Sequence, residues 1–455
     1  MPLPAPLQYL ALLLPLTTLA QSVHLTGTVD LSVQEGTLTA DITMSSLPPQ
    51  IDYSILLNGG LNVKRMTDST GELGYSIERD WDGEVSFEAF HYWLPTSDRA
   101  ARFLPPNLRL QYTGKFPVYR DTTEMTEWDD WKGNIAFNGR TVRATEQSVW
   151  YPVFYDRVTG ELHTAVTYDL EINCADCSAI YLGGSDPQES SQVRLRSDQP
   201  AELMLFAGDF ELSQRGAIAY INADLDAEQE QAVTDTTRAI QAYYADLLGM
   251  PYGKTITYLQ ATPVAKRPEW SFVSFPTFAR VGREYTFSRA IDSSGRVKEY
   301  DVATMAHELA HYYFGSAYRP SGPLFWPLLE GTTEYLALQY VRDHGTAEAY
   351  QRKLAGYAEV SKGESGTDFP SLTEVTTRSQ LDERYRYNLF PLLLTRLEET
   401  AGRAAVLEFL RGVLNSGVGE ANYAFLLDQL AAAGIDQESF ETVEKKVLNE
   451  VAPRQ

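Results

Sequence analysis

The most informative stretch of the sequence is Met305-Ala306-His307-Glu308-Leu309-Ala310-His311-Tyr312-Tyr313-Phe314-Gly315. Its pattern predicts a helix over Asp301–Phe314 that ends at Gly315. Residues four apart lie on one face of a helix, so His307 and His311 can direct their rings at one point. Two imidazoles in this arrangement can share a metal ion, and Glu308 can take a proton from a water at that ion without being a ligand. The stretch therefore predicts a metal site with a catalytic base.

The next helical pattern supplies a third ligand. Eighteen residues separate His311 from Glu330, and Glu330 lies in a predicted helix over Pro327–Tyr340. A carboxylate here completes a two-histidine, one-glutamate set, which holds catalytic zinc and leaves a fourth position for water. We predict one Zn²⁺ bound by His307, His311 and Glu330. Glu334 lies one turn further on and is either a hydrogen-bond acceptor for His307 or an ordinary exposed glutamate.

Composition narrows the class of protein. The chain has 455 residues, of which 44% are hydrophobic, enough for the cores of two or three domains. This excludes a disordered chain, a collagen-like repeat and a disulfide-rich miniprotein. The 61 acidic residues outnumber the 38 basic ones, giving a net charge of -23. Such a surface repels phosphate backbones, so we expect no nucleic-acid partner.

The first twenty residues are typical of an export signal. They carry no charged side chain, contain an apolar run from about Leu7 to Ala20 and end in small residues suited to cleavage before Gln21. An uncleaved anchor or a buried first strand is the alternative interpretation. No later segment reaches 18 uninterrupted apolar residues, so we expect no stable membrane insertion. The chain is predicted to be exported, to a periplasm or to the outside of the cell.

The two cysteines agree with export. Cys174 and Cys177 enclose a turn after a strand-like run, and two thiolates alone cannot form a four-thiolate zinc site. We predict a local disulfide that closes a short loop and contributes little to global stability.

Periodicity divides the chain into regions. After residues 1–20, the region 21–209 shows short alternating runs separated by turn residues, which predicts an antiparallel β sandwich or saddle. Region 210–400 mixes a strand at Thr255–Ala261 with helices, including one over Asp226–Leu248 capped by Gly249. Residues 401–455 form a helical C-terminal segment. The predicted class is α+β multidomain.

The motif and its surroundings resemble one enzyme family. His307-Glu308-Leu309-Ala310-His311 with the following Tyr-Tyr-Phe-Gly, and then Leu-Leu-Glu330-Gly-Thr-Thr-Glu-Tyr, are similar to the motifs of the aminopeptidase N family of gluzincin zinc metallopeptidases. The spacing of eighteen residues matches that family. About 65 residues follow Phe390, so the chain resembles a short member that lacks the large C-terminal helical domain, with a more open site.

The resemblance implies a thermolysin-like catalytic domain that releases N-terminal amino acids from peptides. His307, His311 and Glu330 would hold zinc, and Glu308 would be the base and then the proton donor. The family also uses a tyrosine to stabilise the oxyanion. Tyr385 is assigned this role, and Tyr387 is the competing choice because the family's lysine is absent from the sequence Tyr385-Arg386-Tyr387-Asn388.

An aminopeptidase must also recognise a free α-ammonium. The family does so with glutamates, one of them in a Gly-x-Met-Glu-Asn strand that is absent here. Glu269 and Glu284 lie near the expected place, and Glu146 is a candidate from the N-terminal domain, but each is also consistent with a plain surface carboxylate, so none is assigned.

Peptides are therefore the expected partners, and no residue pattern assigns an oligomeric state. Two other interpretations remain open. One is a zinc endopeptidase or oligopeptidase with the same site, and the other is a non-catalytic peptide-binding surface protein. The intact Glu308 argues against the second, since a protein that only binds has no need of that base.

Overall fold

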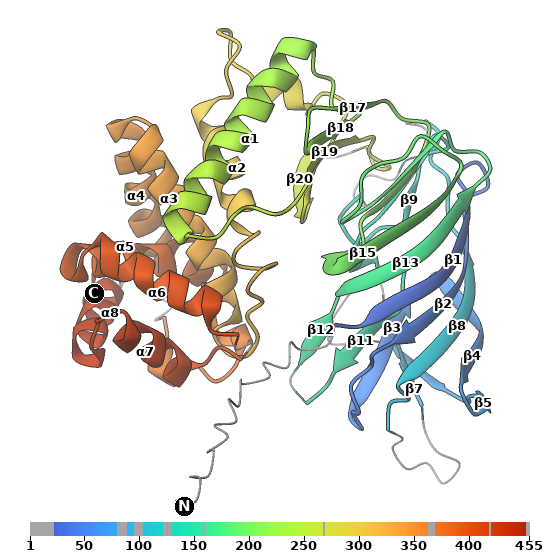
Figure 1. Cartoon of the computed structure of the whole chain (residues 1–455), viewed down its shortest axis with the longest axis horizontal. Helices are drawn as coiled ribbons and strands as arrows, with labels where there is room; N and C mark the ends of the chain where they lie inside the picture. The colour runs from blue at the N-terminus through green and yellow to red at the C-terminus, as the bar shows by residue number, and fades with distance from the viewer. Residues whose placement is uncertain are drawn as a thin grey trace, which may run out of the picture.

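The computed structural model describes residues 22–79, 89–94, 103–121, 125, 130–158, 160–266, 269–362, 369–417 and 420–451. Figure 1 shows a β-rich part built from the first half of the chain beside a helical part built from the second half. Several sheets followed by helices confirm the predicted α+β class. The export signal predicted at residues 1–20 lies outside the described residues.

The largest sheet has seven strands. Their order is β15 (Gln192–Glu202), β13 (Ala165–Cys174), β1 (His24–Ser32), β2 (Thr37–Ser45), β8 (Asn107–Lys115), β4 (Leu61–Asp68) and β5 (Gly71–Glu72). Burial alternates along β2 and β13, as in a sheet with one face on a core. Neighbouring strands are antiparallel except β1 and β13, which run parallel. The predicted antiparallel pattern therefore has one exception in this sheet. A long segment of chain connects β1 to β13, and such a connection allows two strands to pair in parallel.

Two smaller sheets complete the β-rich part. One has the order β12 (Glu161–His163), β11 (Val153–Asp156), β3 (Tyr53–Asn58), β7 (Ala89–Trp93) and β6 (Ser76–Arg79). The other has the order β14 (Ala179–Leu182), β16 (Leu205–Gly208), β10 (Thr141–Ala144) and β9 (Ala136–Phe137). Strands β3, β10, β14 and β16 are buried along their whole length. A single core includes Ile42, Leu56 and Val142, one residue from each sheet.

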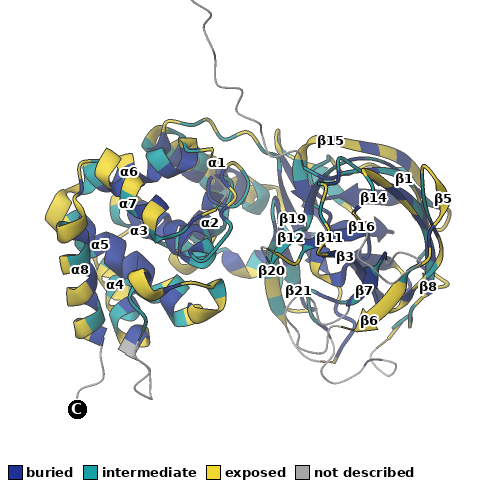
Figure 2. Ribbon diagram, turned by 90° about the horizontal axis from the view of Figure 1, so that it is seen from below, coloured by how far each residue is buried: buried dark blue, intermediate teal, exposed yellow. Residues whose placement is uncertain are grey.

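A fourth sheet belongs to the helical part. Its order is β17 (Leu212–Gln214), β18 (Ile218–Ile221), β19 (Ile256–Ala261), β21 (Thr277–Val281) and β20 (Trp270–Ser274). Strands β18, β19 and β21 are parallel, and β20 is an antiparallel edge strand. A small cluster that includes Phe206 and Leu259 joins this sheet to the β-rich part. Figure 2 accordingly shows β19, β20 and β21 between the two parts.

Helices cover this sheet and continue to the C-terminal end. They are α1 (Ala227–Leu248), α2 (Glu299–Ala310), α3 (Thr332–His344), α4 (Ala347–Lys362), α5 (Phe390–Ala401), α6 (Arg403–Asn415), α7 (Tyr423–Ala432) and α8 (Gln437–Val451). The sequence predicted α1 and its cap: Asp226 accepts hydrogen bonds from the first turn, and Gly249 ends the helix at φ 70°. Val233 of α1, Tyr258 of β19 and Leu309 of α2 share one core.

Short helical turns connect the longer elements. In the part of the chain that the structure describes, four of these are 3₁₀ turns, at Glu146–Ser148, Phe287–Ala290, Leu372–Glu374 and Arg378–Gln380. Two are π-helical, η3 (Pro327–Gly331) before α3 and η6 (Tyr385–Leu389) before α5. No helix among the described residues combines the length and apolar character needed to cross a membrane.

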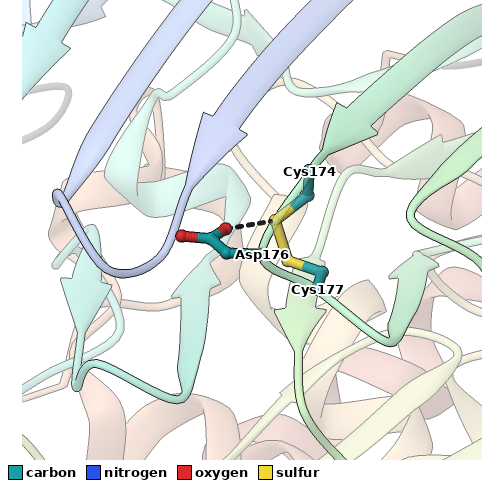
Figure 3. Close-up of side chains that lie close together, drawn as sticks. All are labelled: Cys174, Asp176 and Cys177. Carbon is teal, nitrogen blue, oxygen red and sulfur yellow. Dashed lines mark hydrogen bonds between the residues drawn. A yellow bond between two sulfur atoms is a disulfide. The ribbon is translucent and has the colours of Figure 1, made fainter.

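The predicted disulfide between Cys174 and Cys177 is confirmed and closes the turn after β13 (Figure 3). Asp176, inside this turn, accepts hydrogen bonds from Ser32 Oγ at 2.8 Å and Gln34 N at 2.8 Å. The turn is thereby tied to the β1–β2 connection. Both sulfurs are used in the disulfide, so this group of cysteines and aspartate is a structural feature and not a metal site.

Candidate metal centre and active site

The two predicted histidines come from the end of α2. His307 lies in its last turn, and His311 is the first residue beyond it, still with helical φ and ψ of -62° and -15°. The helical spacing is therefore kept although the helix ends four residues earlier than predicted. The ring centroids are 5.1 Å apart, and the ring planes are almost perpendicular. This arrangement lets both Nε2 atoms face the same point.

The third predicted ligand, Glu330, lies next to both histidines. Glu330 lies in the π-turn η3, and its Oε2 is 3.3 Å from His307 Nε2 and 3.4 Å from His311 Nε2. Ligands about 2.0–2.1 Å from a tetrahedral zinc are separated by about 3.3 Å, which these distances match. One ligand atom from each residue lies within 4.8 Å of the others. The residues present therefore fit a zinc ion, and their donor set is the one known for catalytic zinc.

Hydrogen bonds fix the orientation of both rings. His307 Nδ1 donates to Glu334 Oε2 at 2.8 Å, and His311 Nδ1 donates to the carbonyl of Phe314 at 3.1 Å. With Nδ1–H held by these acceptors, a metal can take the place of a proton on each Nε2. Of the two interpretations of Glu334 that the sequence left open, the structure favours the hydrogen-bond acceptor.

The electrostatics of the site favour bound positive charge. Burial lowers the pKa of His307, but hydrogen bonds with Glu330 and Glu334 outweigh burial and raise it well above its usual range. Burial raises the pKa of Glu330, but the charge of His311 and the hydrogen bond with His307 hold it far below its usual value. The carboxylates thus remain ionised and stabilise a cation among the ligands.

Glu308 lies beside the three ligands. Its Oε2 is 3.9 Å from His311 Nε2, and its side chain is 22% exposed. It lines a cavity of about 620 Å³ together with His307, Glu334 and Tyr387. The predicted base therefore faces a space that a substrate can enter.

The assignment of Tyr385 requires a correction. Tyr385 is 1% exposed, and its ring packs against Phe369 in the core of the helical part. Tyr387, the competing choice, lines the cavity, and its ring centroid is 6.0 Å from that of His307. Residues two apart in a helical turn face nearly opposite directions, so only one of them can reach the site. The structure places Tyr387 there.

Sequence reasoning missed two residues behind the histidines. Lys353 and Tyr357 lie one turn apart on α4, and both bind Glu334: Lys353 through an ion pair, and Tyr357 by donating its hydroxyl to Oε1 at 2.7 Å. Together with His307 they satisfy both oxygens of the Glu334 carboxylate. The available signal was the four-residue spacing of Lys353 and Tyr357, which fits one face of a helix but does not reveal the partner.

The three candidates for ammonium recognition are all paired with cations of the chain. Glu269 and Glu284 share Arg289, at 3.7 and 3.3 Å, and their side chains are 42% and 79% exposed. Glu146 is buried and forms an ion pair with Lys132. None of the three is therefore a free carboxylate.

Comparison with known proteins identifies the fold. No protein-family model matches the chain, and no curated protein matches its sequence. Among solved structures, native yeast leukotriene A4 hydrolase matches with a TM-score of 0.66 and 16% identity over 95% of this chain and 68% of that chain. An M1 zinc metallopeptidase from Deinococcus radiodurans matches with a TM-score of 0.60 and 16% identity over 96% and 94% of the two chains.

A variant of the Deinococcus radiodurans enzyme bound to a Tyr-Ser-Ala substrate matches with a TM-score of 0.59 and 16% identity over 96% and 95% of the chains. The match extends over nearly the whole of both chains, so it includes the β-rich part as well as the sheet and helices that carry His307, His311 and Glu330. The resemblance predicted from the sequence is thus confirmed at the level of the fold, and the chain has the fold of the M1 zinc metallopeptidases.

Proposed function

We propose that the chain is a zinc-dependent peptidase that hydrolyses peptide bonds. One observation carries this proposal: two imidazole Nε2 atoms lie 3.3 and 3.4 Å from one carboxylate oxygen, with Glu308 beside them at a cavity. The fold likeness to an M1 metallopeptidase that was studied with a Tyr-Ser-Ala substrate supports peptides as the substrate class.

His307, His311 and Glu330 would hold the ion. Zinc, when bound, supplies Lewis acidity, which in catalytic sites lowers the pKa of water to about 7. Glu308 takes a proton from the attacking water at its carboxylate and passes it to the leaving amine. Tyr387 donates its hydroxyl to the carbonyl oxygen as negative charge develops there. Burial raises the pKa of Tyr387 well above its usual range, so this hydroxyl keeps its proton.

The resemblance implies release of N-terminal amino acids, and an endopeptidase or oligopeptidase is the second candidate. A specific observation favours the second candidate, namely that Glu146 is buried against Lys132, while Glu269 and Glu284 both lie within ion-pair distance of Arg289. An exported location stays a prediction from residues 1–20.

Metal analysis combined with two variants tests the proposal. The wild-type chain should bind one zinc and hydrolyse peptide reporters. Glu308→Gln should keep the zinc and lose hydrolysis by about 10²–10⁴-fold, because only the proton acceptor is removed. Glu330→Ala should lose the zinc itself. Wild-type turnover by Glu308→Gln, or full zinc occupancy in Glu330→Ala, would contradict these roles.

A further inference from the structure

The cavity beside the proposed base follows one face of α2. It is lined by Tyr300, Ala303, Thr304, His307 and Glu308, and residues at these spacings lie on one side of a helix. From the first to the last of them the helix rises by about 12 Å. The cavity of about 620 Å³ therefore extends from the proposed zinc ligand His307 to the N-terminal turn of α2.

Small and apolar side chains form much of the cavity wall. Val341 of α3 and Ala349 of α4 line it and are 4% and 7% exposed. Ala303 lines it from α2. Alanine at two of these three positions leaves open a space that a longer side chain would occupy.

Two aromatic rings lie at different places along the cavity. Tyr387 lines it near His307, with 6.0 Å between the ring centroids. Tyr300 lines it from the first turn of α2 and is 82% exposed. A ring that the chain itself leaves uncovered can pack against an apolar group that enters the cavity.

The charged side chains of the cavity wall are bound to one another. Arg352 Nη2 lies 3.1 Å from Glu299 Oε2, and Lys353 pairs with Glu334. Glu308 is the remaining carboxylate among the described residues of this wall, and the proposed reaction uses it. A charged substrate side chain would therefore leave water without gaining a free partner, whereas burial of an apolar side chain is favourable.

We propose that this cavity receives a large apolar side chain of the substrate, carried by the residue that supplies the leaving amine. The inference rests on the proposed peptidase function and specifies its substrates. Glu308 passes a proton to that amine in the proposed reaction, so the amine lies beside Glu308, and the cavity opens at the same side chain.

Ala303 and Tyr300 are accordingly specificity-determining residues. Ala303 leaves the space open, and Tyr300 packs against the side chain that fills it. A cavity that contributes nothing to recognition would leave the choice of substrate unchanged when its wall is altered. The test must therefore compare substrates.

A mixture of peptides tests the preference without assuming which bond is cleaved. The zinc-loaded wild-type chain is given the mixture, and mass spectrometry identifies the residues on both sides of every cleaved bond. Relative to their abundance, Phe, Leu and Met should follow the cleaved bond at least about tenfold more often than Ala, Asp or Lys, because burial of a large apolar side chain strengthens binding by such a factor.

The other outcomes of this digest are distinct. Equal use of these residues after the cleaved bond, or a preference confined to the residue before it, would overturn the proposal. Failure to cleave any peptide, with one zinc bound, would instead reject the proposed function.

Two reporter peptides that differ only in this residue, Phe or Ala, then assign the preference to the cavity. Ala303→Leu should lower the ratio of kcat/KM for the Phe peptide to kcat/KM for the Ala peptide at least about tenfold, because the added side chain occupies the space. Ala347→Leu is the matched control, since Ala347 is an exposed residue of α4 outside the cavity wall, and it should keep the wild-type ratio. An unchanged ratio in Ala303→Leu would overturn the proposal.

Tyr300 provides a second test, which decides the matter if Ala303→Leu does not fold or loses zinc. Tyr300→Ala should lower the same ratio by about three- to tenfold, because a ring that contacts the substrate is lost. Tyr300→Phe keeps the ring and should restore the wild-type ratio. Since Tyr300 is exposed, neither change should affect folding. A wild-type ratio in Tyr300→Ala would overturn the proposal.

Discussion

Tyr385 and Tyr387 show how strongly the role of a residue depends on where its side chain lies. Tyr385 packs into the core against Phe369, whereas Tyr387 lines the cavity beside His307. The sequence placed both residues at the start of a helix and could not establish which face of that helix meets the site. That choice depends on the packing of distant elements.

Phenylalanine substitutions distinguish the two tyrosines. Tyr387→Phe should lower kcat by about 10²–10³-fold while zinc content is unchanged, because a donor to the developing negative charge is lost. Tyr385→Phe should keep kcat within about threefold of wild type. Steady-state kinetics with a peptide reporter measure both, and an equal loss in the two variants would show that the site is not organised around Tyr387.

Lys353 acts on the ligands through Glu334. It pairs with the carboxylate that accepts the Nδ1 proton of His307. Lys353→Met should weaken zinc affinity by about 10–100-fold, as expected when a group that orients a ligand is lost. Competition with a chelator measures this affinity. Arg352→Met is the matched control, since Arg352 is 70% exposed and pairs with Glu299, and it should leave zinc affinity unchanged.

At the scale of elements, two π-turns bring site residues together. Glu330 lies in η3, Tyr387 lies in η6, and the backbone N–H groups of Thr332 and Phe390 close these turns on Pro327 and Tyr385. Each residue of an α-helix advances by about 100°, so one extra residue in a turn changes which side chains face the site. The sequence predicted helices here but not these turns, because the hydrophobic pattern does not record a single local irregularity.

Gly331 allows η3 to approach α5 closely. A β-carbon at this position would lie 2.5 Å from Phe390 Cδ1 and 2.9 Å from Phe390 Cβ. Phe390 is buried, so Gly331→Ala should lower the free energy of unfolding by about 1–3 kcal/mol and weaken zinc binding through Glu330.

Urea denaturation and zinc titration measure the two effects of Gly331→Ala. Gly356→Ala is the matched control, because a β-carbon there meets nothing within 4 Å. It should leave zinc binding unchanged and stabilise α4 by up to about 1 kcal/mol. Tight zinc binding and wild-type stability in Gly331→Ala would contradict the close approach.

At the scale of the whole molecule, buried charges gather where the β-rich part meets the helical part. Glu202, at the end of β15, accepts a hydrogen bond from Thr164 Oγ1 at 3.2 Å. Burial and then the charge of Glu146 raise the pKa of Glu202 to about 7, and Lys132 and Arg319 oppose this rise. A carboxyl whose pKa is higher in the folded state stabilises that state at low pH, and this contribution is lost as the pH rises through about 7.

Glu202→Gln removes this dependence of stability on pH, and the amide oxygen still accepts the hydrogen bond from Thr164. The free energies of unfolding of the variant and the wild type should differ least below about pH 4.5. Above pH 7 the variant should be more stable by on the order of 1–3 kcal/mol. Denaturant unfolding at pH 5 and pH 8 provides the comparison. If the free energies of unfolding of the two proteins differed by the same amount at both pH values, Glu202 would be excluded as the titrating group.

The sequence predicted the architecture and the grouping of His307, His311 and Glu330 better than the surroundings of the site. Alternation along β2 and β13 and the spacing of His307 and His311 are local patterns, and they predicted strands and a ligand pair. The contact of Lys132 with Val273 joins residues far apart in the chain, so no local pattern predicts it. Parallel pairing of β1 with β13 was missed for the same reason.

The His307–His311–Glu330 cluster and the Lys132–Glu146 pair belong to different halves of the molecule, each built around its own core. Substitutions near β9 and β10 can therefore be made without altering the core that holds the elements of His307, His311 and Glu330.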